Sequence, residues 1–449
     1  MKTPFIGKEK AEEIAAAVGT PYYVYDAEGI KNALSGLKNA FAWCDFKEYY
    51  AVKACPNPYI LKLIKDCGGG ADCSSYTELL LASSVGFAGE DIMFSSNVTP
   101  AEDFEAARAL GAVINLDDIT HIDFLEKHGG IPEKICLRYN PGGNFEISGE
   151  IMGSPEEAKY GMTRAQIMEA VPVLLGKGVK EFGLHAFLAS NMQNEDYWPK
   201  LAEILFELAA DVRDKYGVTV SFINLSGGIG IPYRPEDAPV DIAAVGERVK
   251  EVFENESKKR GLALPAVKAE LGRYMTGPYG ILVSRVIHMK HIYREYAGLD
   301  ACAANLMRPA MYGSYHHITV LGKENDEPDT VYDVTGGLCE NNDKFAVNRL
   351  LPKIEPGDLV AIHDAGAHGF SMGYNYNGKL RSAEVLLEKD GTWKLIRRAE
   401  TPKDYFATFG FEGADIEVKD RFYTLSAALR SFPDKFSGMT KKAAADITI

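Results

Sequence analysis

Short apolar runs alternate with longer segments of helical periodicity between residues 46 and 271 of the chain. Each run has the length and the bounding turn residues of a buried β-strand. We predict strands within residues 47–54, 70–75, 91–96, 112–118, 134–140, 181–187, 222–228 and 266–271.

The segments between these runs have the spacing of amphipathic helices, most clearly over residues 197–217. Gly217 is placed to end that helix. Its apolar positions follow the i, i+3, i+4, i+7 rule and are Leu201, Ile204, Leu205 and Leu208. Eight strands that alternate with helices predict an α/β fold built on a (β/α)8 barrel, in which functional side chains lie at the carboxyl ends of the strands.

The pattern changes after about residue 273, where segments such as 330–337 and 381–400 look like strands. Asp390-Gly391 is a hairpin signal within the second of them. We predict a mostly β second domain, a β-sandwich or β-barrel-like unit. The opening segment "TPYYVYDAEGI" looks like a strand followed by a helix start, so we expect it to join that domain. The expected domains are residues 31–272 for the barrel, and residues 1–30 with 273–449 for the β domain.

The composition is that of a globular protein that can bury a sizeable core, with 46% hydrophobic and 25% charged residues among 449. A net charge of −14 argues against a nucleic-acid-binding surface. No run approaches eighteen apolar residues and the N-terminus lacks a signal-peptide core, so we expect a cytoplasmic protein with no membrane partner. The seven cysteines are odd in number and have no CxxC spacing, which argues against a disulfide framework or a zinc cluster. We expect no bound metal.

Lys53 lies in the stretch "YYAVKACPNP", near the end of the first predicted strand. One interpretation is a lysine that extends from the strand end to solvent. The other is a Schiff-base lysine, because desolvation lowers the pKa of the ammonium and exposes a nucleophilic amine. The strand pattern alone does not choose between them.

A glycine-rich segment, "LSGGIGIPY", follows the seventh predicted strand. Glycines let backbone amides approach an anion closely, and loops after the late strands of such barrels are a usual phosphate site. A reactive lysine together with a late-strand phosphate loop is the pairing that pyridoxal phosphate requires.

Three polar residues at predicted strand ends fit the same cofactor. Glu270 ends the eighth strand and suits the ring nitrogen, which it would keep protonated, although a solvated rim carboxylate is the alternative. Arg273 could hold a phosphate or a carboxylate through its planar guanidinium. His185 could stack on the pyridine ring, or it could simply be a packed polar residue.

Taken in order, these segments resemble the alanine-racemase-like, fold type III pyridoxal phosphate enzymes, and within them the diaminopimelate decarboxylases. The resemblance covers nearly the whole chain, through "GTPYYVYD", "YYAVKACPN", "GADCSSYTEL", "SGGIGIPY", "ELGRY", "LMRPAMYGSYHH", "CENND" and "DAGAHGFSMGYNYNGKLRSAEVL". It implies a cofactor barrel, a C-terminal β domain and a homodimer whose active sites are each completed by the partner chain.

The resemblance also implies roles for single residues. It places Lys53 on the cofactor aldehyde, His185 on the ring face and Glu270 on the ring nitrogen. The whole implied cofactor-binding set is Lys53, His185, Ser190, Gly228, Glu270, Gly272, Arg273 and His368.

For the substrate, the resemblance implies that Arg308 and Tyr312 act with Arg273 to hold a distal carboxylate. Cys339 matches the acid that protonates the carbanion after carbon dioxide leaves, and Glu340 matches the residue that receives the distal ammonium. The last two are expected to come from the neighbouring subunit. The expected reaction is decarboxylation of meso-diaminopimelate to L-lysine.

Three departures from the family pattern leave the substrate open. "HAFLAS" stands in place of a "HCHIGS"-like stretch, "ELGR" in place of "EPGR", and His368 in place of a tyrosine. The alternative substrate is another basic or D-configured amino acid of the ornithine or lysine type. A racemase is less favoured because Cys339 fits a decarboxylase arrangement. A non-catalytic homologue would be expected to lose Lys53 or Cys339, and both are present.

Overall fold

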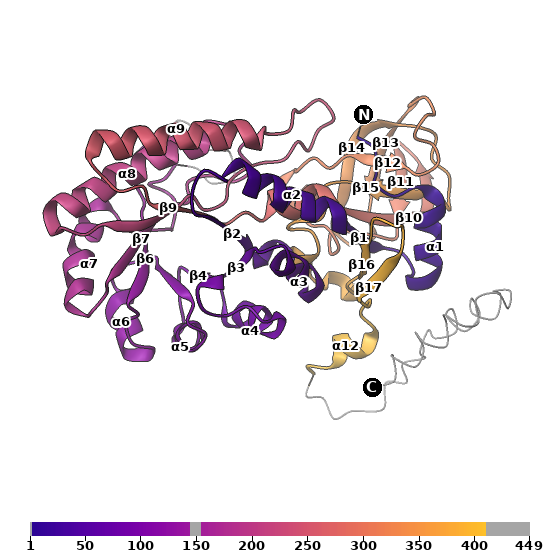
Figure 1. Cartoon of the computed structure of the whole chain (residues 1–449). Coiled ribbons are helices and arrows are strands. Elements are labelled where there is room, and N and C mark those ends of the chain that lie inside the picture. The colour runs from indigo at the N-terminus through magenta and orange to yellow at the C-terminus, as the bar shows by residue number, and fades with distance from the viewer. Residues whose placement is uncertain (1, 144–153, 410–449) are drawn as a thin grey trace.

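The computed structural model describes residues 2–143 and 154–409, and the fold consists of a barrel and a β domain side by side (Figure 1). The eight predicted strands form a closed parallel barrel in chain order. Its strands are β2 Phe46–Ala51, β3 Gly70–Cys73, β4 Ile92–Ser95, β5 Val113–Leu116, β6 Lys134–Arg138, β7 Glu181–His185, β8 Val220–Asn224 and β9 Ala266–Ala269.

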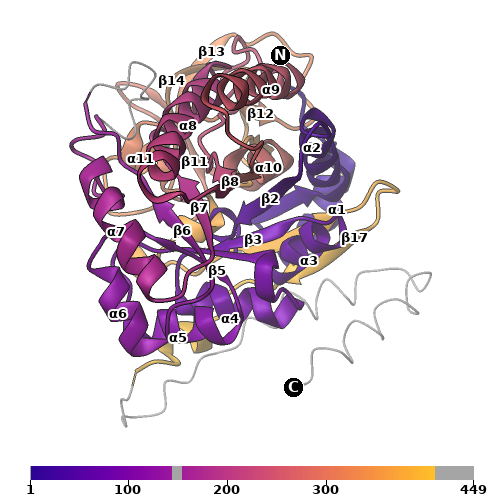
Figure 2. The same cartoon turned by 60° about the vertical axis from the view of Figure 1, so that its left-hand side comes forward.

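Helices surround the barrel strands on the outside (Figure 2). They are α2 Ala27–Ala40, α3 Pro58–Asp66, α4 Tyr76–Val85, α5 Ala101–Ala109, α6 His121–His128, α7 Arg164–Gly176, α8 Tyr197–Tyr216 and α9 Ile242–Arg260. The predicted helix over 197–217 is confirmed as α8, and Gly217 ends it in the left-handed conformation. Leu201, Leu205 and Leu208 are buried, as the apolar spacing requires.

Side chains from alternate strand positions fill the centre of the barrel as a cluster separate from the larger core. They are Tyr49, Met93, Val113, Cys136 and Phe222. Gly183 of β7 faces this cluster, since a Cβ there would lie 2.0 Å from the Phe222 ring.

The second domain is built on a nine-stranded sheet whose main path runs β14-β13-β11-β10-β1-β16-β17, with β15 pairing β10 and β12. The strands are β1 Tyr22–Asp26, β10 Gly280–His291, β11 Glu295–Leu299, β12 Ile318–Val320, β13 Thr330–Thr335, β14 Lys344–Leu351, β15 Leu359–Ile362, β16 Ala383–Leu387 and β17 Trp393–Arg397. The remaining α-helices are α1 Lys8–Val18, α10 Arg273–Thr276, α11 Arg308–Tyr312 and α12 Pro402–Phe406.

The N-terminal strand belongs to this second sheet, as expected. β1 lies between β10, to which it runs antiparallel, and β16, to which it runs parallel. The fold class predicted from the sequence is therefore confirmed. We propose the expected division into residues 31–272, and 1–30 with 273–449; of these, 144–153 and 410–449 lie outside the described residues. Within the described part of the chain, no helix is long and apolar enough to cross a membrane.

Candidate active site

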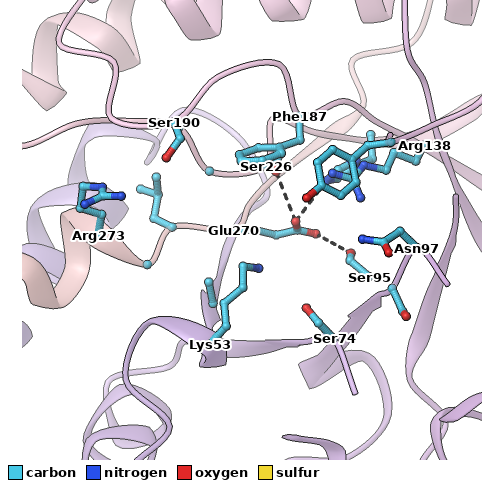
Figure 3. A pocket seen from close by; sticks show the side chains of 18 of the residues that line it. Lys53, Ser74, Ser95, Asn97, Arg138, Phe187, Ser190, Ser226, Glu270 and Arg273 are labelled. Atoms are coloured by element: carbon cyan, nitrogen blue, oxygen red, sulfur yellow. Dashed lines mark hydrogen bonds and ion pairs between the residues drawn. The ribbon is translucent and has the colours of Figure 1, made fainter. Parts of the chain in front are cut away.

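A cavity of about 370 Å³ opens at the carboxyl ends of the barrel strands. All eight residues expected to bind the cofactor line it, and Figure 3 labels four of them, Lys53, Ser190, Glu270 and Arg273. The eight are Lys53, His185, Ser190, Gly228, Glu270, Gly272, Arg273 and His368. Residues from the ends of distant strands thus meet at one place, as the barrel fold predicts.

Lys53 follows β2 in a short 3-10 turn, Val52–Ala54, and its side chain extends into the cavity. Its Nζ lies 3.0 Å from Oδ2 of Asp72, a fully buried residue of the adjacent strand β3. Burial lowers the pKa of Lys53, but the carboxylates of Asp72 and Glu270 raise it more, so the net pKa is above the ordinary value. The expectation that desolvation would lower this pKa was wrong, because the carboxylates of Asp72, Glu270 and Glu78 together outweigh burial.

Glu270 is the centre of a buried hydrogen-bond network. Oε1 accepts from Asn224 Nδ2 at 2.7 Å and from Ser95 Oγ at 3.3 Å. Oε2 accepts from Ser226 Oγ at 3.4 Å and lies 3.1 Å from His185 Nε2. Burial raises the pKa of Glu270, but His185 and Lys53 outweigh it and hold the pKa at about 2. This is a buried, ionised carboxylate and not a solvated rim group.

His185 donates to that carboxylate through Nε2, since an ionised carboxylate can only accept. Its ring is 1% exposed. Burial lowers its pKa in spite of the neighbouring Glu270 charge. The geometry therefore assigns His185 to orienting Glu270.

The loop after β8 forms a narrow backbone cradle. Gly228 has φ +100°, and a Cβ there would lie 2.4 Å from the Tyr197 ring. A Cβ on Gly227 would lie 2.7 Å from the Glu270 carbonyl oxygen. Within the described residues, the N–H groups of Gly227 and Gly228 make no hydrogen bond to the protein. Unpaired amides in a cradle too tight for side chains are suited to an anion such as a phosphate.

Arg273 and Arg308 both lie close to the ring of one tyrosine, Tyr233. Their guanidinium carbons lie 5.7 and 5.4 Å from the Tyr233 ring centroid, and Arg273 also donates to the Tyr233 hydroxyl. Both arginines are buried, and neither pairs with a carboxylate among the described residues. Burial lowers the pKa of Arg308, and Nε of this residue has no partner.

His368 has the left-handed backbone, with φ 55°, and its N–H donates to the carbonyl of Ala54 at 2.9 Å. The residue is thereby fixed beside Lys53. Burial, and then the charges of Arg273 and Arg308, lower the pKa of His368 well below the ordinary value. The imidazole of His368 is therefore kept neutral in the same cavity by burial and by the nearby positive charges.

Four expected residues do not line the cavity: Arg308, Tyr312, Cys339 and Glu340. Cys339 is exposed, and its N–H donates to Asn377 Oδ1 at 2.8 Å. Tyr312 is 59% exposed. A single chain therefore does not place the proposed acid, Cys339, in its own cavity.

The sequence reasoning missed several residues that form the site. They are Asp72, Ser95, Asn224, Ser226, Arg138, Tyr160 and Phe187. Asp72 had a signal, because an aspartate inside a predicted buried strand needs a partner. Phe187 also had one, since it falls within the departure "HAFLAS".

Residues 27–277 match the family model for the pyridoxal binding domain of pyridoxal-dependent decarboxylases. Protein TabA of Pseudomonas amygdali pv. tabaci is 39% identical over 405 residues, which cover 90% of this chain and 94% of TabA. The diaminopimelate decarboxylase of Methanothermobacter thermautotrophicus is 35% identical and covers 89% of this chain and 94% of its own.

Solved structures agree with these matches. A diaminopimelate decarboxylase from M. jannaschii, in complex with L-lysine, superposes with a TM-score of 0.83 at 30% identity. The alignment covers 88% of this chain and 93% of that one. The agreement extends over both the barrel and the β domain.

Proposed function

The chain belongs to the pyridoxal-dependent decarboxylases of fold type III, and from that premise we propose that its reaction is decarboxylation of meso-diaminopimelate to L-lysine and carbon dioxide. The family makes it a carboxy-lyase with pyridoxal phosphate as cofactor. The substrate is the part that we propose. The observation that supports it most strongly is the pair of buried arginines on Tyr233, which no carboxylate of the described chain neutralises.

Two unpaired guanidinium groups next to the cofactor cavity suit a substrate with a carboxylate far from the reacting carbon. Meso-diaminopimelate has such a group. L-Lysine and L-ornithine instead end in an ammonium, which two buried arginines repel. We therefore assign the distal carboxylate to Arg273 and Arg308, with Tyr312 beside them, and the distal ammonium to Glu340.

Each chemical group of the cofactor is assigned to residues that suit it. We assign the aldehyde to Lys53, the phosphate to the amides around Gly228 and Gly272 with Ser190, and the ring nitrogen to Glu270. An anionic Glu270 keeps that nitrogen protonated, because its own pKa is far below neutral. When bound, the cofactor supplies the electron sink that accepts the electron pair left by the departing carbon dioxide.

The active unit is a homodimer with shared sites in this proposal. Cys339 is exposed, and its N–H donates to Asn377, the neighbour of the exposed Tyr376. α11 packs against β14, and both elements present exposed apolar side chains. These exposed side chains are Met311, Tyr312, Val347, Leu350 and Tyr376. An exposed apolar surface of this kind is suited to a second copy of the chain, which would supply the acid that a single chain's cavity lacks. Across it, Cys339 would donate the proton and Glu340 would bind the distal ammonium.

The test is release of carbon dioxide from meso-diaminopimelate by cofactor-loaded protein, with lysine assayed as the product. L-Lysine and L-ornithine serve as comparison substrates, and Lys53→Ala as the inactive control. Lysine in equal amount to carbon dioxide supports the proposal. Release from ornithine or lysine, with none from meso-diaminopimelate, would favour the alternative substrates, for which the presence of His368 is the specific argument.

A further inference from the structure

His185 is the last residue of β7, and Phe187 lies two residues further, in the segment that follows the strand. Side chains alternate along a strand, so Gly183 and His185 lie on the same side of β7. Gly183 meets the Phe222 ring, His185 meets Glu270, and Phe187 lines the cavity. Both side chains thus line the cavity, and Phe187 is the less buried of the two.

We propose that Phe187 is the positioning residue that packs against the face of the cofactor ring, while His185 acts only through Glu270. This rests on the family's cofactor and not on the identity of the substrate. The imidazole is already engaged at Nε2 by the carboxylate and is 1% exposed. Phe187 is only partly buried and reaches the cavity, as Figure 3 shows for its ring and for Lys53.

Two neighbouring side chains, Tyr160 and Arg138, contact the ring of Phe187. The edge of Tyr160 meets it with 6.3 Å between ring centroids at an interplanar angle of 71°. The guanidinium of Arg138 lies 4.4 Å from the Tyr160 centroid and 5.7 Å from that of Phe187. Asp117 fixes this arginine at 3.1 Å. Phe187 therefore forms an apolar part of the cavity wall and packs against Tyr160 and Arg138.

Such a wall has a chemical use in this cavity. Lys53 and Glu270 bind opposite ends of a flat aromatic ring, and neither of them supports its face. Aromatic rings prefer to pack on aromatic rings, at a gain beyond area burial. A phenyl ring also provides this contact without a group that can take up or release protons.

The experiment measures cofactor binding alone, with no substrate present. Pyridoxal phosphate is titrated into the full-length apoprotein, and the visible absorption and visible circular dichroism of the lysine-bound cofactor are followed. For Phe187→Leu we expect a dissociation constant raised by roughly 3- to 10-fold and a weakened dichroic band. Phe187→Tyr keeps the aromatic ring, so its dissociation constant and the intensity of its dichroic band should stay within about twofold of the wild-type values. Unchanged thermal unfolding of the apoproteins shows that each variant folds.

His185→Gln is the matched comparison, because glutamine can still donate to Glu270 but has no ring. We expect it to keep the dichroic band and to lose less affinity than the leucine variant. The proposal is overturned if Phe187→Leu binds like wild type, or if His185→Gln loses the band while Phe187→Leu keeps it. A wild-type protein that binds no cofactor would instead contradict the family assignment, and a failed substrate assay would leave this result untouched.

Discussion

Lys53 and Asp72 form an ion pair across neighbouring barrel strands, with 3.0 Å between Nζ and Oδ2. The register of β2 and β3 sets this pair, because Ala51 lies opposite Asp72 and Lys53 follows two residues later. Burial raises the pKa of Asp72 to about 7 in spite of the lysine, and the carboxylate in turn stabilises the charged lysine. Only the neutral amine attacks an aldehyde. We therefore expect the ion pair with Asp72 to slow the attack of Lys53 on the cofactor aldehyde.

Asp72→Asn is expected to speed attachment of the cofactor at neutral pH. Removal of the Asp72 carboxylate takes away the largest of the influences that raise the pKa of Lys53, so the pKa falls and more of the amine is neutral. Each unit of pKa corresponds to roughly a tenfold change in that fraction. Stopped-flow growth of the visible band between about pH 6 and 10 should show the rate profile moved to lower pH. Ser74→Ala, in the same cavity wall, is the uncharged control; a profile shared by all three proteins would contradict the role of Asp72.

The sequence predicted the eight barrel strands because each is a short apolar run between polar helix faces, and that pattern is local. The residues expected to bind the cofactor could be predicted to lie together, because all strands of a parallel barrel have their carboxyl ends at the same end of the barrel. Lys53 and Glu270 could therefore be placed together with no knowledge of the loops between them.

The register between neighbouring strands and the direction of individual side chains could not be predicted from the sequence. The pairing of Ala51 with Asp72 depends on how two strands align, and without it the direction of the Lys53 pKa shift was wrongly predicted. The engagement of His185 with Glu270 depends on side-chain direction at the barrel mouth. The long strand β10 was also missed, because its buried first half runs into an exposed second half with no turn between them.

Arg308→Gln is expected to weaken use of meso-diaminopimelate without affecting the cofactor. A charged hydrogen bond to a buried group contributes about 1.5–3 kcal/mol, so kcat/KM should fall by roughly 10- to 150-fold. The dissociation constant of pyridoxal phosphate should stay unchanged. Arg234→Gln is the control, because that arginine also lies over a tyrosine, at 4.5 Å from the Tyr315 centroid, but is half exposed. Equal losses in the two variants would exclude a specific role for Arg308.

Cys339→Ala is expected to fold and bind the cofactor but to turn over roughly 10²- to 10⁴-fold more slowly, the usual effect of losing a positioned proton donor. In the proposed dimer each site needs two chains, so mixing Cys339→Ala with Lys53→Ala tests the dimer directly. Random pairing should restore about a quarter of the wild-type activity, since half of the dimers then have one intact site. No recovery after dissociation and reassociation would place Cys339 and Lys53 in the same chain's site.

Lys268→Met is expected to stabilise the protein. Lys268 is 8% exposed inside the barrel, where its Nζ donates to the Tyr49 hydroxyl at 3.2 Å and lies 4.0 Å from the Phe222 centroid. It forms no ion pair with a carboxylate among the described residues, and burial lowers its pKa to about 8. A methionine of similar length avoids the cost of burying that charge, so the free energy of unfolding at pH 7 should rise by about 1–2 kcal/mol.

The same lysine should give the wild type a characteristic pH dependence. The pKa in the folded state, about 8, lies below the unfolded value of about 10.4, so the unfolded chain binds more protons between them. Wild-type stability attributable to Lys268 is therefore lowest below pH 8 and recovers as the pH rises toward 10.4. Thermal unfolding across this range should show the advantage of the methionine variant shrinking with pH. Lys62→Met, at an exposed helix position, should show no such trend; a gain in Lys268→Met that is constant with pH would mean that packing, and not charge burial, is responsible.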